Sequence, residues 1–311
     1  MNIASNAMPG SAFEAGSGTP AINSPTRPLY WSIRREVWEN RSIYLVPLAV
    51  AVVFLFGFLI SAIHPPGKLR EMLTFNPMQE PESLEQPYNF AALLMMGTTL
   101  IVGIFYCLDA LYGERRDRSI LFWKSLPVSD LTIVLSKASI PLAVLPLLTF
   151  VIILATQWLM LLMSTAVLWG RGESASMLWT QLPFFQMSLL LLYHLVAVHV
   201  LSYAPMYCWL LLVSAWARRA AFLWAALPVL AIGILEKLIF NTGHFASLLG
   251  SRASGGPDAP DYPEKGNLLV HSMAHLTPVH FLTRPGLWFG LLVAAAFLAA
   301  AVRLRRSQGP I

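Results

Sequence analysis

The stretch LPFFQMSLLLLYHLVAVHVLSYAPMYCWLLLVSAWA, residues 182–217, decides the fold of this chain because it contains no Asp, Glu, Lys or Arg. As one straight helix it would be about 54 Å long, which is too long for one crossing of a bilayer core of about 30 Å and short for two. Pro205 interrupts the run. The number of times this stretch crosses a membrane fixes the number of spans and the side on which the rest of the chain lies.

The composition is that of an integral membrane protein. The 311 residues are 56% hydrophobic and 12% charged, and the mean hydropathy is +0.61, whereas soluble domains carry about 25% charged residues. The net charge of +5 does not indicate nucleic-acid binding, because the cations lie beside apolar runs, as charges that set membrane topology do. Cys107 and Cys208 lie within apolar runs and indicate no disulfide framework.

Charge distribution resolves the ambiguity of residues 182–217. Apolar runs predict spans at about 42–63, 88–112, 131–163, 182–217, 221–240 and 287–302. If residues 182–217 cross once, four basic segments fall on one side, holding four, five, two and three cations, 14 of the 21 Lys and Arg, against six in the three opposite loops. Two crossings would place Arg218-Arg219 and the terminal RLRR outside, against the positive-inside rule. We therefore predict six spans with both termini in the cytoplasm.

The residues before the first span predict a tail and an amphipathic helix. Residues 1–27 are rich in Gly, Ala, Ser, Asn and Pro, which indicates a disordered tail rather than a signal peptide. From Thr26 onward, Tyr30, Ile33 and Val37 recur along one side of a helix, with Trp31 and Trp38 as an aromatic edge and Arg35 four residues before Glu39. This pattern predicts a helix on the membrane surface; an ordinary cytosolic helix that precedes a span is the alternative.

The stretch GERRDRSILFWKSLPVSD, residues 113–130, lies on the predicted cytoplasmic side between spans two and three. Ser119–Leu126 has helix-forming residues, Pro127 ends them, and Ser129 or Asp130 can cap the next helix. Aliphatic and aromatic residues lie there next to cations, a pattern typical of a helix that docks into a groove of another protein. The alternative is a topogenic basic loop whose apolar side chains lie in the lipid interface.

The longer run LYGERRDRSILFWKSLPVSDLTIVLSK, residues 111–137, resembles the segment after the second span in permease subunits of type-2 ABC transporters of the export class. The resemblance extends over residues 28–306, which would form a single six-span permease domain followed by a short tail at 307–311. It implies that the loop is a coupling helix contacting the ATP-binding subunit, and that residues 266–283 form outer re-entrant helices between spans five and six. The coupling residues would be Glu114, Arg115, Arg116, Asp117, Arg118, Phe122, Trp123 and Lys124.

The chain carries no phosphate-binding G-x-x-x-x-G-K-[ST] motif, since its only Gly-Lys pair, Gly67-Lys68, is followed by Leu. The chain is therefore expected to have no enzymatic activity and no cofactor of its own. A separate ABC ATP-binding subunit would hold ATP and Mg²⁺. The resemblance further implies a second permease copy, identical or related, in a bacterial cytoplasmic membrane.

Several polar residues within the spans are expensive in lipid and are therefore expected to face helix partners or a cavity. They are Asp109, Gln157, Gln186, His194 and His199. Asp109 lies near the cytoplasmic end, where a solvated position is expected. His194 and His199 are five residues apart and do not share a helix face. His244, His271, His275 and His280 follow the fifth span without an H-E-x-x-H pattern, so we predict no metal site.

The sequence thus predicts an all-α integral membrane protein that exports a small molecule, peptide or lipid-like substrate by alternating access. The main alternative is an ion-coupled secondary transporter, which would depend on Asp109 or His194. A third possibility is a membrane assembly or sensor protein that keeps the docking loop but transports nothing.

Overall fold

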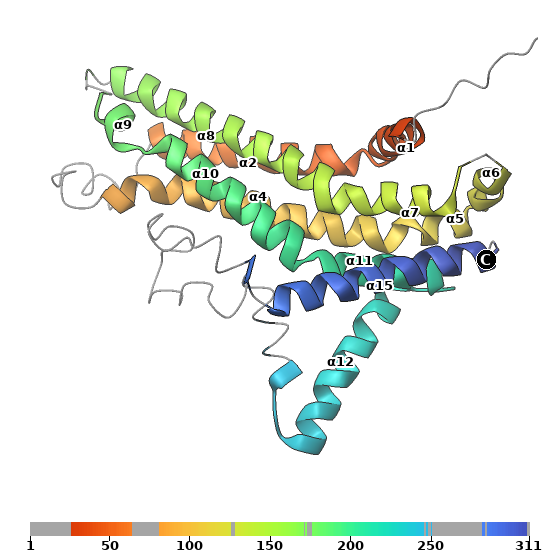
Figure 1. The fold of residues 1–311 in the computed structure, drawn as a ribbon. Coiled ribbons are helices and arrows are strands. Elements are labelled where there is room, and N and C mark those ends of the chain that lie inside the picture. The colour runs from red at the N-terminus through yellow and green to blue at the C-terminus, as the bar shows by residue number, and fades with distance from the viewer. Residues whose placement is uncertain are drawn as a thin grey trace, which may run out of the picture.

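The computed structural model describes residues 26–63, 81–125, 128–170, 172, 176–245, 247, 250, 282–283 and 285–309. All regular secondary structure in these residues is helical, and six helices are long and apolar enough to cross a membrane. The long helices run side by side in an elongated bundle (Figure 1). The prediction of an all-α, multi-pass membrane protein is confirmed at this level. Of the tail predicted at residues 1–27, residues 1–25 lie outside the described residues, and Thr26 and Arg27 instead begin the first helix. Of the re-entrant helices predicted at residues 266–283, residues 266–281 lie outside the described residues.

The first two helices are α1, Thr26–Glu39, and α2, Ser42–Ile63. Ile33 and Val37 of α1 pack against the core of the bundle, whereas Tyr30, Trp31 and Trp38 are exposed. Tyr30 therefore lies with the tryptophans rather than with the inward stripe. The predicted pair forms, with Arg35 Nη2 2.9 Å from Glu39 Oε2.

The second and third spans are longer than predicted. Helix α4, Pro81–Ala110, continues into the short α5, Tyr112–Arg116. The third span combines α7, Asp130–Ser139, a π-helical segment η1, Ile140–Val144, and α8, Leu145–Gly170. Pro141 lies at the start of η1. A proline has no N–H to donate to the carbonyl four residues earlier, and the wider π-helical turn accommodates this missing hydrogen bond.

Residues 182–217 cross the bundle once. They form α10, Phe184–His194, the π-helical segment η2, Leu195–Ser202, and α11, Ala204–Trp216. In Figure 1, α10 begins beside the short α9, Ser176–Gln181, at one end of the bundle, and α11 continues toward the opposite end. Pro205 lies in the first turn of α11, where its missing N–H costs nothing. Helix α9 was not predicted.

The last two helices differ in how they pack. Helix α15, Pro285–Ser307, lies along α11 and buries Ala294, Ala301 and Val302 against it and its neighbours. Helix α12, Ala221–Phe240, has the predicted bounds but projects away from the bundle (Figure 1), and among its residues only Ala221 and Ala225 are buried. Its remaining apolar surface is therefore open to lipid or to a partner.

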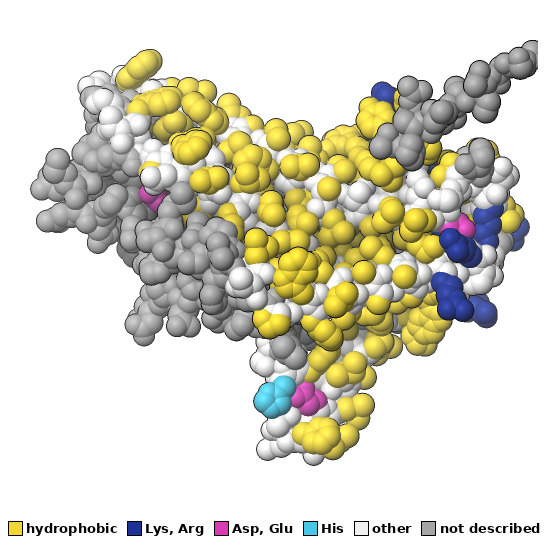
Figure 2. Space-filling model, viewed as in Figure 1, with side chains coloured by type: hydrophobic (Ala, Val, Ile, Leu, Met, Phe, Trp, Pro, Cys, Tyr) yellow, Lys and Arg dark blue, Asp and Glu magenta, His cyan; other side chains and the backbone are white. Residues whose placement is uncertain are grey.

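The two ends of the bundle differ in charge. Figure 2 shows hydrophobic side chains over the flanks of the helices, whereas the Lys and Arg side chains in view gather mainly at the end that carries α6, Ser119–Ser125, and the C-terminal end of α15. Exposed cations at this end include Arg118, Arg303 and Arg306. We call it the cationic end of the bundle.

Ser129 begins α7 as the sequence predicts. Its backbone is extended, with φ −70° and ψ 145°, and its Oγ accepts a hydrogen bond of 3.1 Å from the Thr132 N–H. Ser129→Ala is expected to lower the free energy of unfolding by about 1 kcal/mol because a helix N-terminus loses its cap. The matched control is Ser125→Ala, since Ser125 Oγ only donates to the Phe122 carbonyl. Thermal unfolding measures both, and equal losses would contradict the capping role.

Candidate functional site

The charged loop between α4 and α7 folds into two short helices. Helix α5 ends at Arg116, and Arg118 adopts a left-handed conformation with φ 59°, which turns the chain into α6. Such a conformation costs a residue with a Cβ about 1–2 kcal/mol. The Ser119 hydroxyl donates to the Glu114 carbonyl across this turn at 3.4 Å. These contacts define the corner between α5 and α6.

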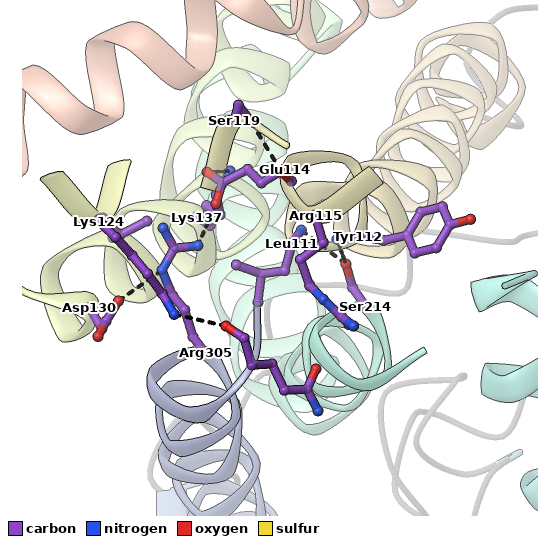
Figure 3. Close-up of polar contacts among 12 residues, drawn as sticks. Leu111, Tyr112, Glu114, Arg115, Ser119, Lys124, Asp130, Lys137, Ser214 and Arg305 are labelled. Atoms are coloured by element: carbon purple, nitrogen blue, oxygen red, sulfur yellow. Dashed lines mark hydrogen bonds and ion pairs between the residues drawn. The ribbon is translucent and has the colours of Figure 1, made fainter. Parts of the chain in front are cut away.

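Glu114 of α5 lies in a buried ion cluster, which we define as Glu36, Glu114, Asp130, Lys137 and Arg305. Figure 3 labels all of these except Glu36. Lys137 Nζ is 3.1 Å from Glu114 Oε1 and 2.8 Å from Glu36 Oε1. Arg305 Nη1 pairs with Glu114 Oε2, and Arg305 Nε is 3.1 Å from Asp130 Oδ1. Lys137 and Arg305 each bridge two carboxylates.

Four of the five charged side chains in this cluster are buried, so each needs an oppositely charged partner. Lys137 is 3% exposed, Glu36 3%, Arg305 4% and Glu114 8%. Charges removed from water to this extent are tolerated only when they are paired in good geometry. Tyr106 adds a hydrogen bond of 2.9 Å from its hydroxyl to Glu36 Oε2. The cluster therefore requires α1, α5, α7 and α15 to keep fixed relative positions.

Arg115 anchors the loop on a second side. Its guanidinium donates to the carbonyls of Ala215 and Ala217, at the C-terminal end of α11, and its Nε lies 3.5 Å from the Gly309 carbonyl. The last carbonyls of a helix have no partner within it and carry partial negative charge, so a cation stabilises them. Ser214 Oγ also accepts from the backbone N–H groups of Leu111 and Tyr112, at 2.9 and 2.8 Å.

Helix α6 is attached on one side and free on the other. Ile120 is buried, Trp123 lies under the Arg35 guanidinium at 3.2 Å from the ring centroid, and Lys124 Nζ donates to the Gln308 carbonyl at 2.8 Å. By contrast, Leu121 and Phe122 are 56% and 60% exposed. The outer face of α6 thus presents two adjacent large apolar side chains, while the opposite face is attached to α1 and to the residues after α15.

The structure divides the eight predicted coupling residues into two groups. Glu114 and Arg115 are buried and hold the loop to the helix ends, and Trp123 is half-buried under Arg35. The others are exposed: Arg116, Asp117, Arg118, Phe122 and Lys124. Among the predicted coupling residues, only this second group has exposed side chains for a partner, and Leu121 lies beside it.

The predicted intramembrane polar residues do not form one site. Asp109 is exposed and lies 3.8 Å from Arg116, and Gln186 is exposed on α10. His199 is buried, with its Nε2 3.0 Å from the Tyr207 hydroxyl. Gln157 and His194 line a separate small pocket together with Asn89, which the sequence analysis did not single out. The prediction that His194 and His199 form no pair agrees with this arrangement.

The described residues contain no group of three or more His, Cys, Asp and Glu that could hold a metal ion. His244 is exposed, while His271, His275 and His280 lie outside the described residues. The candidate functional site is the exposed face of α6, together with the buried ion cluster that holds the neighbouring α5 in place. The chain matched no protein-family model, no curated protein and no solved structure, so function must be argued from this geometry.

Proposed function

We propose that this chain is the membrane-spanning permease subunit of an ATP-driven exporter in a bacterial cytoplasmic membrane, and that α6 is the contact through which a separate ATP-binding subunit moves it. The six apolar helices support the membrane part of this proposal. The gathering of cations at one end supports a cytoplasmic orientation for that end, since basic residues are enriched in cytoplasmic loops. Both chain termini would then be cytoplasmic.

The observation that carries the proposal is the exposure of Leu121 and Phe122 on a firmly anchored helix. A topogenic loop that dips apolar side chains into lipid needs no fixed base. Here α6 is held by Arg35, by the C-terminal residues after α15 and by the buried ion cluster through α5. Apolar anchors on a rigid support, ringed by exposed cations, are typical of a protein-binding surface.

The same contacts give a route for coupling. Helix α5 continues α4, and α7 opens the third span, so displacement of α6 would act on two spans at once. Glu114 and Lys137 join these two spans directly. ATP, held together with Mg²⁺ by the partner, would supply the energy for switching between two conformations of different nucleotide affinity. The chain's own part would be to transmit that movement without breaking the buried ion pairs.

The first test replaces an apolar anchor. Phe122→Ala is expected to weaken association with the ATP-binding subunit about 30-fold or more, since a central aromatic anchor contributes about 2 kcal/mol or more. The matched control is Phe222→Ala, because Phe222 is 62% exposed, against 60% for Phe122, but lies at the start of α12. The measurement is the amount of ATP-binding protein per permease after purification from native membranes in mild detergent, by quantitative mass spectrometry.

Three outcomes would overturn the proposal. One is wild-type chain that purifies without an ATP-binding protein under conditions that preserve known complexes, which would favour an ion-coupled secondary transporter. Another is equal loss of the partner in both phenylalanine variants. The third is a fall in the amount of inserted protein for Phe122→Ala alone, which would assign α6 to membrane topology instead.

A further inference from the structure

A small pocket lies between α4, α8 and α10, away from the cationic end of the bundle. It has a volume of about 20 Å³ and is lined by Asn89, Met96, Gln157, Met187, Leu191 and His194, among others. Gln157 is twenty residues beyond Lys137 along the third span, which corresponds to roughly 30 Å of helix. The pocket is therefore separated from the buried ion cluster by about the thickness of a hydrocarbon core.

Gln157 brings an unpartnered acceptor to this pocket. Its side chain is 2% exposed, and its Nε2 donates to the Tyr88 carbonyl at 3.3 Å. Its Oε1 is buried and has no hydrogen-bond partner among the described residues. A buried acceptor left unpaired is unfavourable, so this oxygen favours a bound donor in the adjoining space.

His194 brings a second acceptor. Its Nδ1 lies 3.1 Å from the Leu190 carbonyl. A carbonyl only accepts hydrogen bonds, so Nδ1 carries the proton, and in the neutral ring Nε2 is then an acceptor. Gln157 of α8 and His194 of α10, which both line the pocket, thus each have one acceptor available for a bound donor, and Asn89 of α4 is a further polar residue of the lining. The volume exceeds the roughly 10–15 Å³ that one water molecule needs.

We propose that this pocket binds one hydrogen-bond donor of the size of water, which donates to Gln157 Oε1 and to His194 Nε2 and so bridges α8 to α10. Water and the ammonium ion share this size and donor capacity. The site does not rest on the proposed function. It identifies a polar link between two spans that are otherwise joined mainly by apolar contacts, directly before the π-helical segment η2.

Radiolytic labelling of the full chain in lipid nanodiscs tests the proposal. X-ray pulses in ¹⁸O-labelled water generate hydroxyl radicals from bound water, and these oxidise the nearest methionine. Met187, which is 6% exposed and lines the pocket, is expected to be labelled at least fivefold faster than Met95 and Met160. Both of those are fully buried and lie outside the pocket lining.

Variants at Gln157 distinguish Met187 labelling by a donor bound in the pocket from labelling by radicals that enter from bulk water. Gln157→Leu removes the acceptor and is expected to lower Met187 labelling to the Met95 level. Gln157→Glu keeps an acceptor oxygen on a side chain of the same shape and is expected to retain the fast labelling of Met187. Wild-type Met187 labelling no faster than that of Met95, or fast labelling unchanged in Gln157→Leu, would overturn the proposal.

An ammonium titration identifies the donor. Ammonium chloride that suppresses Met187 labelling more than equal sodium chloride would show that the pocket takes ammonium in place of water. Equal labelling in the two salts would assign the pocket to water. Either result supports the donor site and selects its source.

Discussion

Glu114→Ala is expected to lower the free energy of unfolding by about 3–5 kcal/mol, because it leaves two buried cations short of a partner. Glu114 pairs with both Lys137 and Arg305, which are 3% and 4% exposed. Neither cation can reach water to compensate for the lost carboxylate. Since Glu114 also connects α5 to α7 and α15, the loss should loosen the base of α6.

The matched control is Asp117→Ala in the same loop. Asp117 pairs with Arg116 at 3.0 Å, but both side chains are more than half exposed, and such pairs contribute about 0–1 kcal/mol. Thermal unfolding can be followed with a thiol-reactive dye, because Cys107 and Cys208 are both buried in the folded chain. Similar unfolding temperatures for the two variants would contradict a structural role of the ion cluster.

Pairing within the cluster can be tested by a double-mutant cycle. Once Glu114 is absent, Arg305→Ala should cost less than it does in the wild-type chain, because the arginine has already lost one of its two carboxylates. A coupling energy of about 1–3 kcal/mol is expected for groups in one buried network. Additive effects would mean that the two side chains act independently.

Most of the fold was predictable because membrane spans are encoded locally. Residues 42–63 and 221–240 were predicted with the bounds that the structure gives, since each is one uninterrupted apolar run between polar ends. Charge counting predicted a single crossing for residues 182–217, and α10, η2 and α11 follow one path. The third span was predicted too short because the apolar run is interrupted by Ser164 and Thr165, whereas α8 continues through them to Gly170, with the Thr165 hydroxyl donating to the Leu161 carbonyl of the same helix.

The details of backbone geometry were not predictable from local sequence. Pro141 indicates a disturbance in the third span, but not that the backbone becomes π-helical there. Leu195–Ser202 is also π-helical and contains no proline. That segment packs against α8 and α11, so its geometry depends on contacts between distant parts of the chain.

The buried ion cluster was missed for a related reason. Its members come from positions 36, 114, 130, 137 and 305, and the counting of charges treated Lys137 and Arg305 only as topogenic. Two signals were present in the sequence. Glu36 directly precedes Val37 on the inward side of α1, and Lys137 lies several residues inside an apolar run. A buried cation in such a position requires a carboxylate nearby.

Gly103→Val is expected to lower the free energy of unfolding by about 1–3 kcal/mol or more, through overpacking between α4 and α11. A Cβ at Gly103 would lie 2.9 Å from Tyr207 Cε1 and 3.0 Å from its Oη. Tyr207 is fully buried and bonded to His199, so its ring has no free space into which to move. Close approach of two helix backbones at a glycine is a common means of packing spans in lipid.

Gly97→Val in the same helix is the control, because a Cβ at Gly97 has no atom within 4 Å. The readout is the rate at which the thiol dye reacts below the unfolding temperature. Cys107 lies one helical turn beyond Gly103 and Cys208 follows Tyr207, so local separation of α4 from α11 should expose both thiols. Faster labelling in Gly103→Val, and partial reversal on adding Tyr207→Leu, would show that the steric contact is responsible. Equal labelling rates in the two glycine variants would contradict the steric contact. Any loss of stability would then come from placing a valine in α4, since both positions lie within this helix.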